Sequence, residues 1–165
     1  MKAAQIEKYD KNNIKVNIVK KEKPTITKNE LLIKVVAAGV NPVDNMISRG
    51  EVRMIVPYKL PIISGNEFVG IVEKMGEQVS KFNIGVRVFA RMPLNKIGTF
   101  SEYISVEEEA LAKVPEYLTS IEAAAIPLTA LTIMQALELM GIEKGKTIFI
   151  SGGTGSVGAM AIPIA

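Results

Sequence analysis

A glycine-rich turn near the C-terminal end constrains this chain more than any other feature. Gly152, Gly155 and Gly158 follow a short β-prone run, 146–150, and open an apolar segment, 159–165, whose composition is typical of a helix. Glycines allow a sharp turn and a close approach of the backbone, and a helix N-terminus offers unpaired N–H groups, so this arrangement fits a dinucleotide pyrophosphate. The predicted cofactor-binding residues of the turn are Gly152, Gly155, Ser156, Val157 and Gly158. A tight strand-to-helix turn that binds no ligand is the alternative.

The first two thirds of the chain have the pattern of short strands. Four runs, 14–19, 31–36, 68–72 and 86–90, are rich in β-branched and apolar residues. Glycine, proline and asparagine separate these runs at positions typical of turns. The pattern predicts a small antiparallel barrel or sandwich.

Helical composition begins near residue 119. Thr119 and Glu122 have the spacing of a capping box, and 123–139 reads as a helix interrupted at Pro127. The strand, glycine turn and helix that follow would open a parallel α/β unit. Such a unit needs a second strand after its helix, and none follows within the 165 residues, so we expect the chain to be part of a longer protein.

Composition excludes several classes of function. The chain has no Cys, no His and no Trp, so it lacks the usual ligands of zinc and the residues of Ser-His-Asp and Cys-His catalysis. Its 20 Lys and Arg residues are interleaved with 17 Asp and Glu residues, and a net charge of +3 predicts no nucleic-acid partner. No apolar run reaches the roughly 18 residues of a membrane span, and the N-terminus turns polar too early for a signal peptide. We therefore expect no membrane association and a cytoplasmic location.

Four segments in order resemble the medium-chain dehydrogenase/reductase superfamily, in its zinc-independent quinone oxidoreductase branch. They are 37–44, 64–70, 123–132 and the glycine turn. The resemblance implies an α/β protein in which residues 1–125 form a GroES-like β-barrel catalytic domain. Residues 126–165 would be the first, incomplete part of a Rossmann dinucleotide-binding domain. The chain would then span about half of a typical family member.

The resemblance also bears on metal binding. In zinc-dependent members, zinc ligands occupy the positions of Asn41 and Asn66, and the proton-relaying hydroxyl residue occupies the position of Val43. We therefore predict that the chain binds no zinc. Without a metal, Asp44, Asn66 and Glu67 would serve to tie two loops together by hydrogen bonds.

For activity, the resemblance implies NADPH-dependent hydride transfer to a quinone or an α,β-unsaturated carbonyl, by a full-length protein that forms a homodimer. The protein would supply orientation, water exclusion and hydrogen bonds to a developing enolate oxygen. The 165-residue chain alone would be inactive. The alternative is a non-catalytic nucleotide-binding or structural member of the same superfamily.

Three further residues are candidates for the active site. Asn41 is the candidate polar group near the nicotinamide and substrate, in both a catalytic and a cofactor-binding role, although an Asn before Pro42 is also a good helix cap. Tyr58 could replace, as proton donor, a tyrosine that many relatives carry where this chain has Met46. Thr132 matches a family threonine close to the nicotinamide, and it could equally bond back to a helix carbonyl.

Overall fold

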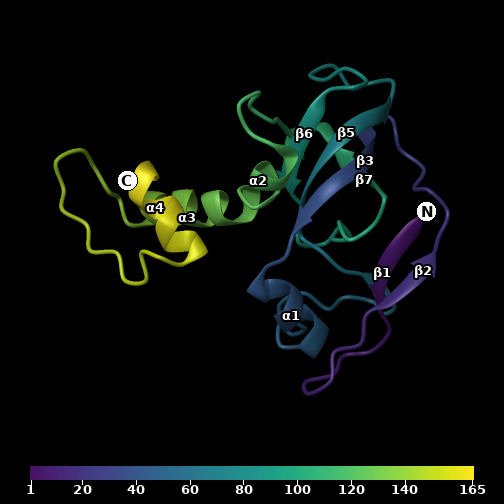
Figure 1. Ribbon diagram of the computed structural model, residues 1–165, viewed down its shortest axis with the longest axis horizontal. Helices are drawn as coiled ribbons and strands as arrows, with labels where there is room; N and C mark the ends of the chain where they lie inside the picture. The colour runs from purple at the N-terminus through teal and green to yellow at the C-terminus, as the bar shows by residue number, and fades with distance from the viewer.

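The computed structural model describes all 165 residues, which form a two-sheet β domain and a helical extension (Figure 1). The smaller sheet contains, in spatial order, β2 (Asn17–Lys20), β1 (Lys2–Ile6) and β4 (Ile62–Ile63). The larger sheet contains, in spatial order, β7 (Tyr103–Glu107), β3 (Glu30–Gly39), β5 (Glu67–Met75), β6 (Arg87–Arg91) and β8 (Ala112–Lys113). Every pairing is antiparallel, as the strand pattern predicts.

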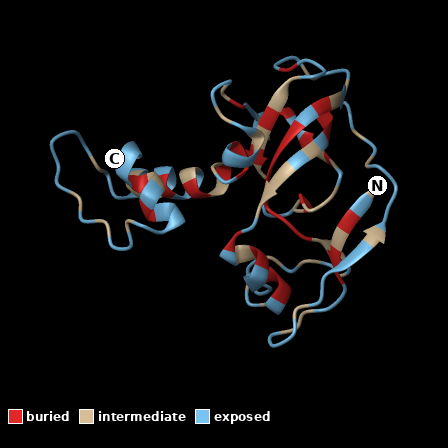
Figure 2. Ribbon diagram, in the orientation of Figure 1, coloured by how far each residue is buried: buried red, intermediate tan, exposed pale blue.

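The core of the β domain lies on one face of the larger sheet. Its buried side chains alternate along β3, β5, β6 and β7, and Figure 2 shows them as a concentration of buried segments in these strands. Ten residues make up this cluster: Leu31, Ile33, Phe68, Val72, Phe82, Val88, Ala90, Met92, Ile104 and Val106. Burying each large apolar side chain contributes about 1.5–3 kcal/mol, so this cluster fixes the register of the sheet.

Three of the predicted strand runs lie almost entirely within observed strands. Runs 31–36, 68–72 and 86–90 correspond to β3, β5 and β6, whereas only the end of 14–19 overlaps β2. Strands β1, β4, β7 and β8 were not predicted, and each is at most 5 residues long.

The helices follow the predicted break at proline. Helix α1 (Pro42–Arg49) follows β3, a short 3₁₀ turn (Glu108–Ala110) precedes β8, and α2 (Ser120–Ala124) begins with the predicted capping box. Pro127 takes the first position of α3 (Pro127–Leu139), so α2 and α3 are separate helices. None of the helices has both the length and the apolar character needed to cross a bilayer.

The predicted strand at 146–150 is wrong. This segment is part of an irregular loop between α3 and α4 (Ser156–Ile164), and the Phe149 side chain is 92% exposed. A parallel strand forms only beside a neighbour, and no strand of this chain lies next to 146–150, so its β propensity has no partner. The helix after the glycine turn is confirmed, and α4 packs against α3 (Figure 1).

Candidate functional site

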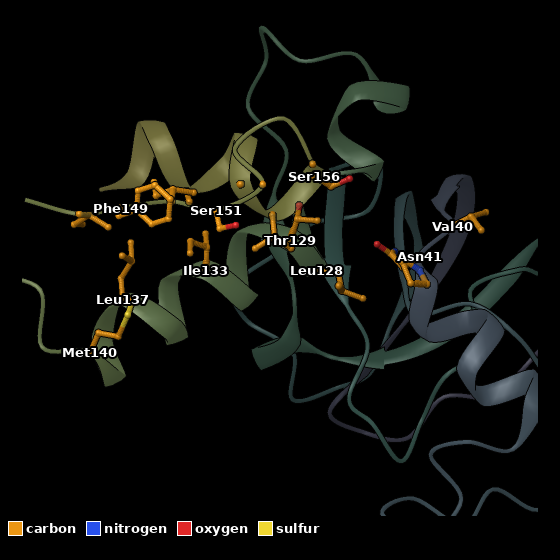
Figure 3. Close-up of a pocket in the computed structure, with 18 residues that line it drawn as sticks. Val40, Asn41, Leu128, Thr129, Ile133, Leu137, Met140, Phe149, Ser151 and Ser156 are labelled. Carbon is orange, nitrogen blue, oxygen red and sulfur yellow. The ribbon is translucent and has the colours of Figure 1, made fainter.

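A cavity of about 530 Å³ lies between the β domain and the helical extension (Figure 3). The β domain contributes Val40 and Asn41, which connect β3 to α1, and Pro42, the first residue of α1. The facing wall consists of one side of α3, the end of the irregular loop, the glycine turn and the first turns of α4. The side chains of that wall are mostly apolar: Leu128, Ile133, Leu137, Met140, Ile148, Phe149, Ile150, Val157 and Ala161.

The cavity brings together most of the predicted site residues. Asn41 lines it from the β domain, and all five predicted residues of the glycine turn line it from the opposite side. Residues that are more than 100 positions apart in the sequence thus share one cavity. The sequence predicted both groups separately, and the structure shows that they face the same space (Figure 3).

The glycines of the turn have different roles. Gly152 has φ of +75°, in the left-handed region that favours glycine. A Cβ at Gly158 would lie 2.2 Å from the Gly152 carbonyl oxygen, so the turn itself requires glycine at 158. A Cβ at Gly155 would meet no atom closer than 3.4 Å, which is ordinary contact. The turn therefore leaves space at Gly155 that a ligand could use.

The N-terminus of α4 is suited to an anion. Gly155 is the N-cap, and no side chain caps the helix. The first N–H groups of a helix have no intrahelical acceptor, and they carry the positive end of the helix dipole. Since Gly155, Ser156, Val157 and Gly158 all line the cavity, the residues present fit the pyrophosphate of a dinucleotide.

A buried network of two carboxylates and two amides supports the cavity from the β domain. The Asp44 carboxylate accepts hydrogen bonds from the Asn41 backbone N–H and from Asn66 Nδ2, both at 2.7 Å. The first of these bonds lies at the start of α1, where Asn41 occupies the N-cap position that the helix-cap interpretation expected. All the side chains of this network are at most 8% exposed.

Glu67 joins this network to the helical extension. Its Oε1 accepts a hydrogen bond of 2.6 Å from Asn41 Nδ2, and its Oε2 accepts one of 2.8 Å from the backbone N–H of Leu128, in the first turn of α3. Burial raises the pKa of the Glu67 carboxyl, and the Asp44 charge adds to the rise, while these two hydrogen bonds oppose it. The predicted tie between two loops is present, and it also reaches a helix that the sequence did not connect to it.

The positions that the resemblance assigns to zinc ligands hold no metal-binding set here. Asn41 and Asn66 donate their amide hydrogens to Glu67 and Asp44, so both carboxylates are already satisfied. No group of three or more Asp or Glu side chains lies close enough to share a metal ion. The residues therefore do not fit a zinc site.

Two predicted site residues lie outside the cavity lining. The Tyr58 hydroxyl donates to the Leu94 carbonyl oxygen at 2.6 Å, and burial raises its pKa. The Thr132 hydroxyl is exposed and donates to the Leu128 carbonyl oxygen at 2.7 Å, which is the helix back-bond that the sequence left open as an alternative. The structure therefore places neither hydroxyl against a ligand in the cavity.

Sequence reasoning missed the apolar wall of α3. Thr129, Ile133 and Leu137 recur every four residues and line the cavity from one helix face. That spacing was visible in the sequence. The same pattern is expected of any helix that packs on a core, so it carries no functional signal by itself.

Comparisons with known proteins agree with this architecture. Residues 27–116 match the family described as Alcohol dehydrogenase GroES-like domain. The chain is 38% identical over 138 residues to the quinone oxidoreductase of Sus scrofa, with 83% of the chain and 41% of the relative covered. It is 33% identical over 148 residues to the NADPH-dependent alkenal/one oxidoreductase, chloroplastic, of Arabidopsis thaliana, with 86% of the chain and 38% of the relative covered.

A solved structure shows the same fold. The quinone oxidoreductase from Coxiella burnetii superposes with a TM-score of 0.89 at 30% sequence identity, over 99% of this chain and 52% of that one. The chain thus spans about half of the length of that structure, and 41% or less of the two curated relatives.

Proposed function

The chain belongs to the quinone-oxidoreductase-like branch of the medium-chain dehydrogenase/reductase superfamily, and on this premise we propose that the full-length protein is an NADPH-dependent, zinc-independent oxidoreductase. Its proposed substrates are quinones and α,β-unsaturated carbonyl compounds. The observation that carries the proposal is the shared cavity, in which the N-terminal turn of α4 faces Asn41 across a mostly apolar space. NADPH, when bound, supplies the hydride.

The residues of the chain would contribute binding, orientation and water exclusion. The N–H groups at the start of α4 would hold the pyrophosphate, with Gly155 leaving room for its approach. The apolar face of α3 would exclude water from the nicotinamide end of the cavity. Asn41 would contact the nucleotide from the β domain.

The choice of substrate class follows from the missing metal ligands. Oxidation of an alcohol in this superfamily needs a zinc ion to stabilise an alkoxide, and the chain has neither Cys nor His to bind one. Quinones and enones are already electrophilic, so their reduction needs positioning of the acceptor rather than activation by a metal. The similarity to the quinone oxidoreductase of Sus scrofa and to the alkenal/one oxidoreductase of Arabidopsis thaliana supports this choice.

The experiment is an assay of NADPH oxidation by the full-length protein after treatment with a chelator, with a benzoquinone and an enone as separate acceptors. We expect acceptor-dependent oxidation in proportion to protein concentration and no stoichiometric zinc in elemental analysis. Nucleotide binding without turnover would favour the non-catalytic alternative. Absence of both binding and turnover, or loss of activity on chelation that zinc restores, would overturn the proposal.

A further inference from the structure

We infer that Glu67 is a positioning residue that sets the orientation of the Asn41 side-chain amide, so that the Asn41 oxygen, a hydrogen-bond acceptor, faces the cavity. The inference rests on the proposed function and identifies the group that Asn41 recognises. That group is a hydrogen-bond donor of the bound nucleotide, either a ribose hydroxyl or the carboxamide NH₂. Asn41 would then not donate a hydrogen bond to the developing oxygen anion of the substrate.

The nitrogen of the Asn41 amide is already committed. Its hydrogen bond to Glu67 Oε1 is 2.6 Å long, and a carboxylate can only accept hydrogen bonds. The second carboxylate oxygen is held at 2.8 Å by the Leu128 N–H. Because Glu67 is 1% exposed, water does not compete for either oxygen.

The oxygen of the same amide is turned the other way. Figure 3 shows this oxygen on the side of Asn41 that faces α4, while the nitrogen is bonded to Glu67. At the start of α1 the Asp44 backbone N–H donates to the backbone carbonyl of Asn41 at 3.0 Å, so the side-chain oxygen of Asn41 keeps its capacity to accept a hydrogen bond. Asn41 itself lines the cavity.

The neighbouring backbone holds the Glu67 carboxylate in this position. Glu67 is the first residue of β5 and is paired with Gly39 at the end of β3. A Cβ at Gly39 would lie 2.2 Å from Glu67 Oε1 and 2.7 Å from the Ala124 carbonyl oxygen. The carboxylate therefore fills the space that the absent side chain of Gly39 leaves, between the end of β3 and the end of α2.

An exchange of the two side-chain types tests the inference. The variants are E67Q, N41D and the double variant N41D/E67Q. In E67Q, the oxygen of the substituted side-chain amide must still accept from Leu128, so the NH₂ of that amide faces Asn41 and forces the Asn41 amide to turn. The double variant keeps the net charge and reverses the direction of the hydrogen bond, and it leaves a carboxylate oxygen of residue 41 facing the cavity.

Dissociation constants for NADPH give the first result. We expect E67Q to bind about tenfold more weakly than wild type, because a donor replaces the acceptor in the cavity. We expect N41D/E67Q to recover to within about threefold of wild type. Full affinity in E67Q, or a double variant that binds as weakly as E67Q, would overturn the inference, since a carboxylate cannot replace a donating amide. Thermal unfolding of each variant controls for folding, because a purely structural role would make affinity follow stability.

Nuclear magnetic resonance of the wild-type chain without nucleotide gives the second result, independent of the proposed function. The Asn41 side-chain NH₂ signals are identified by their absence in N41D. We expect one proton to be shifted downfield and protected from solvent exchange, and E67Q to remove that shift. Exchange as fast as that of the exposed Asn12 amide would overturn the inference even if NADPH did not bind.

Discussion

At the scale of single residues, the buried polar groups next to the cavity form a set in which each of the four carboxylate oxygens accepts a hydrogen bond. Asn41 and Asn66 donate to Glu67 and Asp44, and the remaining carboxylate oxygens accept backbone N–H groups. Burying a carboxylate without hydrogen-bond partners is energetically costly. The hydrogen bonds to the Asp44 and Glu67 carboxylates therefore favour one conformation of this part of the cavity lining.

Replacing Gly155 by Val tests the proposed ligand contact of the turn. A Cβ at this position meets nothing closer than 3.4 Å, so we expect the fold to persist while NADPH binding by the full-length protein is lost. The matched control is T154V, because Thr154 is exposed in the same turn and does not line the cavity. Isothermal titration of both variants measures the difference. Wild-type affinity in G155V would show that the turn binds no nucleotide.

Two buried glutamates should give opposite dependences of stability on pH. Burial raises the pKa of Glu67 above its ordinary 4.5, so its folded form binds more protons, and its contribution to stability is lost as pH rises through the folded pKa. Burial also acts to raise the pKa of Glu30, but hydrogen bonds from Lys96 and Thr27 outweigh it and lower the pKa. The Glu30 contribution is therefore present above pH 4.5 and lost as pH falls through the lowered pKa.

The measurement is the free energy of unfolding by urea as a function of pH for wild type, E67Q and E30Q. As pH falls below 4.5, the difference between wild type and E30Q should shrink. As pH rises above 4.5, the free energy of unfolding of wild type should fall relative to that of E67Q. Parallel curves for the two variants would contradict the assignment.

At the scale of elements, locality decides what the sequence could predict. The capping box of α2 joins residues three apart, so Thr119 and Glu122 were predicted and confirmed. The first turn of α3 is capped by Glu67, which lies 61 residues from Leu128, and no local pattern indicates that bond. The strand prediction for 146–150 was wrong for a related reason. A segment with β propensity forms a strand only where a neighbouring strand can pair with it.

Removing the cap of α2 should destabilise the protein measurably. Thr119 Oγ1 accepts a hydrogen bond of 3.2 Å from the Glu122 N–H, and loss of an N-cap side chain costs about 0.5–2 kcal/mol. We expect T119A to lower the free energy of unfolding by that amount. The same substitution at Thr132, exposed within α3, should have a smaller effect, since its back-bond to a carbonyl is not a cap. Equal effects in the two variants would contradict this account of the helix.

At the scale of the whole molecule, the chain consists of a well-packed β domain and an extension with little packing of its own. The extension exposes large apolar side chains, including Phe149 at 92% and Leu139 at 88%. Figure 2 shows the loop before α4 as mostly exposed, in contrast to the buried strands of the larger sheet. The residues that line the cavity come from both parts. The sequence could therefore indicate each side of the cavity, but not that the two sides face each other.

Hydrogen exchange of the 165-residue chain should separate these two parts. We expect slow exchange in β3 and β5 and fast exchange in 146–155, because the loop has no ladder of hydrogen bonds. The exposed apolar side chains should also cause self-association at high concentration. Mass spectrometry of exchanged peptides and light scattering provide the measurements. A monomer with slow exchange throughout 146–165 would contradict this description of the extension.

The central claim is that Asn41 and the glycine turn form the two sides of one nucleotide site. Its most direct test is a titration of the isotopically labelled full-length protein with NADPH, followed by nuclear magnetic resonance. The account predicts that the backbone amides of Gly155 and Ser156 and the side-chain amide of Asn41 shift together, with one dissociation constant. Shifts confined to one side of the cavity, or to residues outside it, would contradict the claim.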